Sequence, residues 1–232
     1  MTSKQSVYFL TSRSPAGRLA FDLARSLHPT HDWRLLTVET RDDKAAFDAR
    51  APHTPDLLLS FLNPFVVPDA LIDAVQGRAF NIHPATPQNP GRDPQHFAFY
   101  EGATSAGATL HRMIGRVDSG EIIDVLEVPV DRDAGVMPSI EMSEHLSIAL
   151  LAKHLPALLD GTIRPAGQWR WRETARRTRN DFLRMCLLSP SLPAEEMHRR
   201  IAAFFNPAYR TVAIELHGLR FVYDPGSATP QK

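Results

Sequence analysis

The stretch Phe80-Asn81-Ile82-His83-Pro84 places an amide and an imidazole two positions apart in a segment of strand character. Because successive side chains of a β-strand alternate between its faces, Asn81 and His83 project to the same side. Pro84 disfavours helical geometry at His83, so the strand can end with both polar groups at its tip. Open α/β sheets bind their ligands at this end of their strands. We therefore expect a functional site here.

A carboxylate follows in the run Arg116-Val117-Asp118-Ser119-Gly120-Glu121-Ile122-Ile123. An amide can donate a hydrogen bond to a developing oxyanion, an imidazole can accept the proton of a nucleophile, and a carboxylate can orient that imidazole. Asn81, His83 and Asp118 are therefore candidates for catalysing the transfer of a carbonyl carbon. The sequence leaves open whether His83 acts as the base or as a second oxyanion donor.

Segments of strand and helix character alternate on both sides of this stretch. Strands are predicted over residues 7–10, 35–38, 56–61, 78–82, 108–113 and 122–130, and helices over 16–27, 68–75, 95–101 and 139–159. The strand at 56–61 is apolar on both faces, as is typical of a parallel strand covered by helices. The alternation predicts an α/β fold with a Rossmann-like, mostly parallel sheet and helices on both faces.

The chain changes character after residue 160. We expect a catalytic domain over residues 1–160, an arginine-rich connector over 161–180, and a small C-terminal helix and β-hairpin subdomain over 181–232. The helix is predicted near 194–205, and the hairpin strands over 212–216 and 219–223. In the run from Trp169 to Arg179, arginines alternate with tryptophans. This pattern fits either stacking of a nucleotide base or a solvated linker surface.

Composition excludes several classes of protein. Lysine plus arginine equals aspartate plus glutamate at 26 each, so no global field attracts nucleic acid or an anionic membrane. No apolar run has membrane-spanning length, and the first residues lack a secretory signal, so we expect a cytoplasmic protein. The single cysteine, Cys186, excludes an internal disulfide. The ten histidines lack metal-ligand spacing, and no metal is expected.

Three blocks together resemble the formyltransferase family that uses 10-formyltetrahydrofolate: Phe-Asn-Ile-His-Pro-Ala at 80–85, Gly-Ala-Thr-Leu-His at 107–111 and Asp-Ser-Gly-Glu-Ile-Ile at 118–123. The resemblance implies that Asn81, His83 and Asp118 match the family's catalytic set. It also implies a pterin pocket, although apolar residues there would equally serve as core. The residues at its positions are Phe65, Val67, Ile72, Ile114, Gly115 and Arg116. His111, beside Thr109 on a strand, is expected to make a structural hydrogen bond.

The layout is most similar to the short sugar N-formyltransferases. The segment 11–17 lacks the glycine-rich phosphate loop of the glycinamide ribonucleotide branch, and the C-terminal part is shorter than in methionyl-tRNA formyltransferases. In the similar loop over 89–97, Asn89, Arg92 and Gln95 are the implied substrate-binding residues. The sugar enzymes often have an aromatic residue where Arg92 or Asp93 stands here, which puts the acceptor in doubt.

The resemblance implies an N-formyltransferase that uses 10-formyltetrahydrofolate as co-substrate and a primary amine as acceptor. The expected acceptor is an amino sugar on a nucleotide. Two alternatives remain: another small amine, such as a hydroxyornithine-type siderophore precursor, or a catalytically silent folate- or nucleotide-binding protein. The C-terminal hairpin alternates apolar residues and exposes strand edges that could pair in a homodimer.

Overall fold

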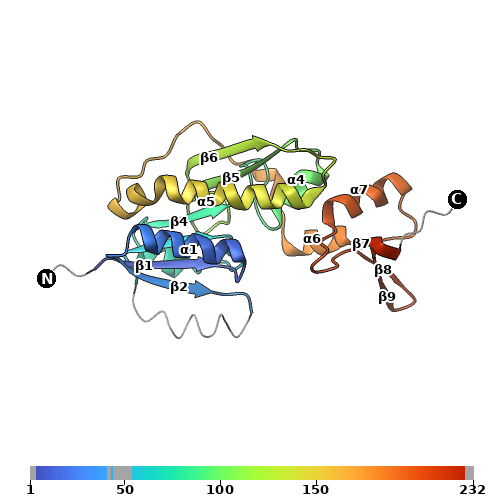
Figure 1. The fold of residues 1–232 in the computed structure, drawn as a ribbon, viewed down its shortest axis with the longest axis horizontal. Helices are drawn as coiled ribbons and strands as arrows, with labels where there is room; N and C mark the ends of the chain where they lie inside the picture. The colour runs from blue at the N-terminus through green and yellow to red at the C-terminus, as the bar shows by residue number, and fades with distance from the viewer. Residues whose placement is uncertain (1–3, 41–42, 44–53, 228–232) are drawn as a thin grey trace.

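A six-stranded sheet runs through the centre of the protein, and a three-stranded sheet lies at its C-terminal end (Figure 1). The structure is a computed structural model that describes residues 4–40, 43 and 54–227. The strands of the main sheet are β1 (Ser6–Thr11), β2 (Asp32–Thr37), β3 (Leu57–Phe61), β4 (Ala79–His83), β5 (Ser105–Arg112) and β6 (Ile122–Pro129). The helices around it are α1 (Pro15–Leu27), α3 (Asp69–Ala74), α4 (Pro94–Tyr100) and α5 (Val136–Asp160).

The strands of the main sheet follow the order β2-β1-β3-β4-β5-β6. The first four along this order, β2, β1, β3 and β4, are parallel. β5 runs antiparallel to β4, and β6 runs antiparallel to β5. The carboxyl ends of the four parallel strands therefore lie at one edge of the sheet. The predicted α/β fold with a mostly parallel sheet is confirmed.

One face of the sheet is covered by α1 and α5, which lie alongside each other (Figure 1). α1 begins at Ser14, whose Oγ accepts a hydrogen bond from the Gly17 N–H at 3.1 Å, and Pro15 occupies the first turn. The apolar sides of both helices bury strand residues of alternating position, including Val7, Phe9, Leu57, Leu59, Phe80, Ile82, Ala108 and Leu110.

The opposite face carries the remaining strand side chains. Tyr8, Leu10 and Leu58 pack there against Ile72 of α3 and against Val67, which precedes that helix. β3 is buried on both faces, as its sequence predicts. Helices therefore cover both faces of the sheet. In the described part of the chain, no helix is both long and apolar enough to cross a membrane.

The C-terminal elements pack against the start of α5 and against α4 rather than standing apart. They are η1 (Glu173–Ala175), α6 (Arg179–Cys186), β7 (Leu187–Leu188), α7 (Ala194–Phe204), β8 (Ala213–Leu216), β9 (Leu219–Val222) and η2 (Pro225–Ser227). Phe97 of α4 shares a core with Phe182, Cys186 and Phe204, and the rings of Phe97 and Phe204 lie 5.2 Å apart. This shared core fixes the C-terminal elements beyond the carboxyl edge of the sheet.

The helix near 194–205 and the hairpin appear as predicted, whereas η1, α6 and β7 do not follow from the sequence pattern. α6 begins with a capping box, in which Thr178 and Asp181 exchange side-chain and backbone hydrogen bonds. Only Phe182 and Cys186 of this short helix are buried. The arginine-rich sequence around them hides that weak periodicity, so the segment resembles a polar connector.

The C-terminus of α5 is fastened to the sheet by an arginine. Arg78, just before β4, donates from Nη2 to the carbonyls of Leu158 and Leu159 at 3.1 and 2.9 Å. Gln5 adds a third donor, from Nε2 to the Leu159 carbonyl at 3.2 Å. These bonds satisfy carbonyls that have no partner inside the helix, and the positive charge suits the negative end of the helix dipole.

We predict that Arg78→Met lowers the free energy of unfolding by about 1.5–3 kcal/mol, because two helix-terminal carbonyls lose a charged donor. Chemical denaturation measures the loss. Arg164→Met is the matched control, since Arg164 is exposed and bonds only to carbonyls of its own turn. An equal loss in both variants would contradict the assigned role of Arg78.

Candidate active site

Two neighbouring strands bring the first polar groups of the site together. β4 carries Asn81 and His83, and the antiparallel register of β5 places His111 directly opposite Asn81. His83 and His111 are buried, with 4% and 2% of their surface exposed, whereas Asn81 is half-buried. All three residues line the same cleft. The predicted orientation of Asn81 and His83 toward one side of the strand matches this geometry.

Asp118 reaches the same cleft from the connection between β5 and β6. Its backbone φ is 44°, in the left-handed region, which costs a non-glycine residue about 1–3 kcal/mol. Arg176 holds this turn, since its guanidinium donates to the carbonyls of Val117 and Asp118 at 2.9 and 3.0 Å. Strain of this kind persists where the surroundings impose it, and it is concentrated at functional sites.

The Asp118 carboxylate lies between the two imidazoles. Its Oδ2 is 3.3 Å from His83 Nδ1, and its Oδ1 is 3.4 Å from His111 Nε2. Oδ2 also accepts the Gly91 N–H at 2.7 Å. Burial alone would raise the pKa of Asp118, but the positive charge that the His83 and His111 imidazoles carry when protonated, together with the Gly91 amide, outweighs burial and holds that pKa well below its usual range. Asp118 is therefore an ionised carboxylate at neutral pH.

Only glycine can occupy position 91. Its φ is 98°, and a β-carbon there would lie 2.3 Å from the Arg177 carbonyl oxygen. The backbones of Gly91 and Arg177 form a parallel bridge at this point. The missing side chain thus lets the loop after β4 lie against the arginine-rich segment while its N–H reaches Asp118.

The contacts of His83 define where its proton sits. Nε2 lies 2.9 Å from the Asn89 carbonyl oxygen, so Nε2 carries the proton and donates it. Burial lowers the pKa of His83, and this effect outweighs the opposing influence of Asp118 and the Asn89 carbonyl. At neutral pH the ring is therefore uncharged, with the lone pair on Nδ1 beside the carboxylate.

His111 orients the amide of Asn81. Nδ1 of His111 donates to the Arg112 carbonyl at 2.7 Å, which leaves Nε2 as an acceptor. Asn81 Nδ2 lies 3.1 Å from that Nε2 and donates to it. This bond places the amide nitrogen, not the oxygen, on the His111 side. Beyond the expected structural hydrogen bond, His111 thus contacts two of the predicted catalytic residues.

The cleft has a volume of about 980 Å³, near the upper end for small-molecule sites. Every residue that the resemblance places in the pterin pocket lines this cleft: Phe65, Val67, Ile72, Ile114, Gly115 and Arg116. Val67 and Ile72 are also buried in the apolar cluster under the sheet, so they serve as core as well. The cleft therefore combines an apolar slot with the polar groups around Asp118.

Of the three residues expected to bind the acceptor, two line the cleft and one does not. Arg92 and Gln95 line the cleft, and Arg92 Nη1 donates to the Pro64 carbonyl at 3.1 Å. Asn89 is buried and lines a separate cavity of about 20 Å³. Its N–H closes a turn onto the Thr86 carbonyl. Asn89 therefore meets the catalytic groups through its backbone carbonyl, which binds His83.

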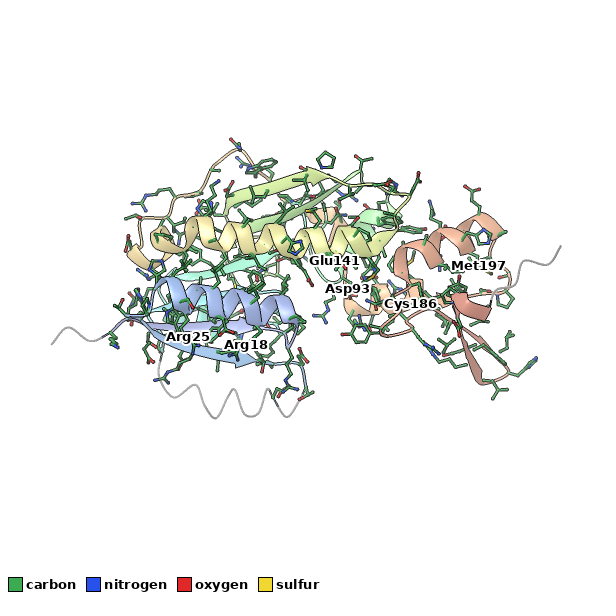
Figure 2. All side chains as sticks on the ribbon, in the orientation of Figure 1. Arg18, Arg25, Asp93, Glu141, Cys186 and Met197 are labelled. Carbon is green, nitrogen blue, oxygen red and sulfur yellow. The ribbon has the colours of Figure 1, made fainter. Side chains whose placement is uncertain are left out.

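The far end of the cleft is charged. Asp93 lies where the main body of the protein meets α6 (Figure 2), and its carboxylate pairs with Arg179 at 3.1 Å and lies 3.6 Å from Arg92 Nε. Glu144 of α5 and Tyr209 also line the cleft. The cleft thus combines the apolar slot, the groups around Asn81 and His83, and a region beside the C-terminal elements that carries both acidic and basic side chains.

No group of three or more histidine, cysteine, aspartate or glutamate side chains is arranged to hold a metal within residues 4–40, 43 and 54–227. The groups that are present can donate to an oxyanion, accept a proton and stabilise the resulting imidazolium. This set suits acyl transfer to a nucleophile.

Sequence reasoning did not assign functional contacts to His111 or Trp171. His111 pairs with Asn81 only through the register of β4 and β5, which the sequence does not specify. The Trp171 ring lies 5.7 Å from that of His83 and 5.0 Å from that of His111. Its position in the arginine-rich segment gave no signal of this contact. The arginines 176, 177 and 179 of the same segment do line the cleft.

Comparison with known proteins identifies the family and similar folds. The formyl transferase family model matches residues 8–143, which is more than half of the 232-residue chain. A protein of Mycobacterium tuberculosis described as a candidate sugar N-formyltransferase has a similar structure, with a TM-score of 0.76 and 22% identity over 98% of this chain and 99% of that one.

Two further solved structures are similar. A sugar N-formyltransferase from a Shewanella species superposes with a TM-score of 0.74 at 18% identity, covering 94% of this chain and 96% of that one. An N-formyltransferase from Helicobacter canadensis, in complex with folinic acid and dTDP-3-aminofucose, gives a TM-score of 0.70 at 14% identity, covering 92% and 85%. These likenesses support the fold, and the family match goes further: this chain belongs to the formyl transferase family.

Proposed function

We propose that this protein is an N-formyltransferase that moves the formyl group of 10-formyltetrahydrofolate to the primary amine of an amino sugar carried on a nucleotide. One observation carries the proposal: the Asp118 carboxylate lies between His83 and His111, with Asn81 bonded to His111, on the wall of one large cleft. The family supplies the reaction class, and this arrangement supplies the groups that the reaction needs.

The amine nitrogen attacks the formyl carbon, and the carbonyl oxygen becomes the oxyanion of a tetrahedral intermediate. Asn81 is the donor for this oxyanion. One N–H of its amide donates to His111, and within the part of the chain that the structure describes the second has no hydrogen-bond partner on this cleft-lining residue. One such donor contributes roughly 100- to 1000-fold in rate.

His83 takes the proton from the attacking nitrogen at Nδ1, because Nε2 already donates to Asn89. The imidazolium that forms is then stabilised by Asp118 Oδ2, 3.3 Å from Nδ1. When the bond between the formyl carbon and N10 of the folate breaks, its electron pair stays on N10. His83 returns the proton to that nitrogen, so the formamide and tetrahydrofolate leave with atoms and charge balanced.

The apolar end of the cleft suits the folate. Phe65, Val67 and Ile72 offer a slot for a flat ring, and residues 114–116 line the same cleft. The Helicobacter canadensis structure holds folinic acid together with dTDP-3-aminofucose. That pair of ligands supports a folate donor and a nucleotide-sugar acceptor for the present protein.

The arginines along the cleft favour an acceptor that carries phosphates. Arg92, Arg177 and Arg179 line it, and guanidinium groups bind phosphates through paired, charge-assisted hydrogen bonds. Arg179 pairs with Asp93 and Arg177 with Glu101, so a phosphate would share or replace those carboxylate partners. A hydroxyornithine-type amine has no phosphate for these guanidinium groups, and this favours the nucleotide sugar over that alternative.

We further propose that the protein acts in the cytoplasm as a homodimer. Its only cysteine is buried and unpaired, which fits a reducing compartment. β9 is the edge strand of the small sheet, and its Leu219 and Phe221 are exposed. An unpaired edge with apolar side chains supports pairing with a second copy.

We predict that Asn81→Ala lowers kcat by about 100- to 1000-fold through loss of the oxyanion donor. Asp118→Asn should likewise lower turnover far more than folate affinity, since its charge no longer stabilises the imidazolium. Formyl transfer to nucleotide-linked amino sugars and to hydroxyornithine gives the rates, and folate titration gives the affinity. Asn180→Ala is the matched control, because Asn180 is exposed on α6.

The assay separates the alternatives. If hydroxyornithine were the only amine formylated, the acceptor would be an amine of that type and not a nucleotide-linked amino sugar. A wild-type protein that binds folate but formylates none of the amines would support a silent binding protein. Unchanged turnover in Asp118→Asn would remove Asp118 from the mechanism.

We predict that His111→Leu lowers kcat because the Asn81 amide loses the acceptor that orients it. His111→Gln should recover part of the rate, since its side-chain oxygen can accept the same N–H. The KM values for both substrates should change little in either variant. If leucine and glutamine gave equal rates, orientation of Asn81 by an acceptor at this position would be excluded.

Sedimentation tests the homodimer. Wild type should sediment at twice the chain mass of 25.9 kDa, and Phe221→Glu should shift it toward the monomer. Leu27→Glu is the control, because Leu27 has the same 53% exposure as Phe221 but lies on α1 of the main sheet, whereas β9 belongs to the small C-terminal sheet (Figure 1). A monomeric wild type, or dissociation by the Leu27 change instead, would rule out this interface.

A further inference from the structure

Trp171 contacts both buried histidines of the site. Its ring lies 5.7 Å from that of His83 at an interplanar angle of 72°, and 5.0 Å from that of His111 at 84°. Edge-to-face arrangements at these separations are favourable for aromatic rings. One indole therefore restricts the planes of the two imidazoles that flank Asp118.

The indole is itself held in place. Nε1 donates to the Gly120 carbonyl at 2.8 Å, in the turn that carries Asp118. The next residue, Arg172, donates its N–H to the Pro87 carbonyl at 3.0 Å, in the loop that follows His83. Trp171 is thus tied to both segments that deliver the catalytic groups.

Close packing links this anchor to His111. A β-carbon at Gly120 would lie 2.0 Å from the Arg112 carbonyl oxygen, so the two backbones are in direct contact. The same Arg112 oxygen accepts the Nδ1 proton of His111. The contacts therefore form a ring. The indole bonds to Gly120, Gly120 packs on Arg112, Arg112 accepts from His111, and the His111 ring packs on the indole.

Trp171 is half-buried and is not among the residues that line the large cleft. The indole therefore covers a part of each ring outside the cleft, and this covered part is the rear of the ring.

We propose that Trp171 is a positioning residue of the formyl-transfer site, which fixes the ring planes of His83 and His111 and excludes water behind them. The proposal rests on the proposed function for its effect on turnover. Its effect on the two rings follows from the contacts alone.

Water access would also change the protonation of His83. The titratable groups facing His83 are Asp118, from the β5–β6 connection, and His111, from β5. The Asn89 carbonyl binds its Nε2, and Arg176 reaches the backbone of Asp118 from the arginine-rich segment. Burial is the largest influence that lowers the pKa of His83. Opening the rear of the ring should therefore raise that pKa toward the ordinary histidine value of about 6.5.

The chain provides a matched pair of variants. Trp171→Phe keeps an aromatic ring but removes the Nε1 donor and part of the covering surface. Trp169→Phe makes the same change two positions earlier, where Nε1 is buried without a hydrogen-bond partner in the described part of the chain. Only the first variant should disturb the histidines.

We expect Trp171→Phe to lower kcat by roughly 10- to 100-fold, as for a small misplacement of catalytic groups, with little change in either KM. Its pH–rate profile should shift in the direction of the raised His83 pKa, and imidazole titration by NMR should show the same shift. Trp169→Phe should match wild type in kcat, in the pH–rate profile and in the imidazole titration. Wild-type titration and kcat in a folded Trp171→Phe protein, or equal losses in both variants, would overturn the proposal.

The NMR titration needs no turnover, so it remains decisive if no acceptor is formylated. In that case the proposed function fails while the role of Trp171 is judged from the rings. Should Trp171→Phe fail to fold, wild type labelled with 5-fluorotryptophan provides the test. The chemical shift of the Trp171 resonance should change with pH as His83 titrates, with the Trp169 resonance as internal reference. A Trp171 chemical shift that does not change as His83 titrates would also overturn the proposal.

Discussion

A single buried carboxylate between two imidazoles determines how this site is built. Asp118 exposes 5% of its surface, and a buried charge is tolerated only where charge and hydrogen-bond partners compensate for the lost water. The Gly91 N–H supplies one such partner, and the carboxylate lies 3.3 and 3.4 Å from the imidazoles of His83 and His111, whose positive charge it balances when either ring is protonated. The left-handed backbone of Asp118 and the glycine at 91 serve this requirement, since the first belongs to the turn that carries the carboxylate to both rings and the second lets the Gly91 N–H reach Oδ2.

The mixed topology of the sheet makes that arrangement available. Parallel strands bring their carboxyl ends to one edge, which places His83 at the cleft. The antiparallel pairing of β5 with β4 then sets His111 opposite Asn81. If β5 ran parallel to β4, the chain would first have to return to the opposite end of the sheet through a crossover connection. The reversal of direction at β5 therefore lets one short connection, from β5 to β6, carry Asp118 back to the strands it serves.

Local rules explain which parts of this structure the sequence predicts. The alternation of side chains along β4 puts Asn81 and His83 on one side without any knowledge of the neighbours, and hydrophobic patterns locate the main strands and helices. The role of His111 depends instead on register, which is decided by pairing between distant segments. α6 and the Trp171 contact depend on packing of an arginine-rich segment whose composition resembles solvated surface. Such residues acquire their neighbours only through tertiary structure.

The arginine-rich segment shows how one stretch of chain serves folding and chemistry together. Arg172 and Arg177 pair with Glu101 at 2.8 Å each, at the end of α4, while Arg176 holds the Asp118 turn. Exposed ion pairs contribute little to stability individually, so the value of these arginines lies in geometry rather than in energy. They fix the segment against the loop after β4, and that position brings Arg176 and Arg179 to the cleft and Trp171 to the rear of the histidines. A charge-rich sequence whose composition resembles solvated surface thereby contributes both to the lining of the cleft and to the packing of its histidines.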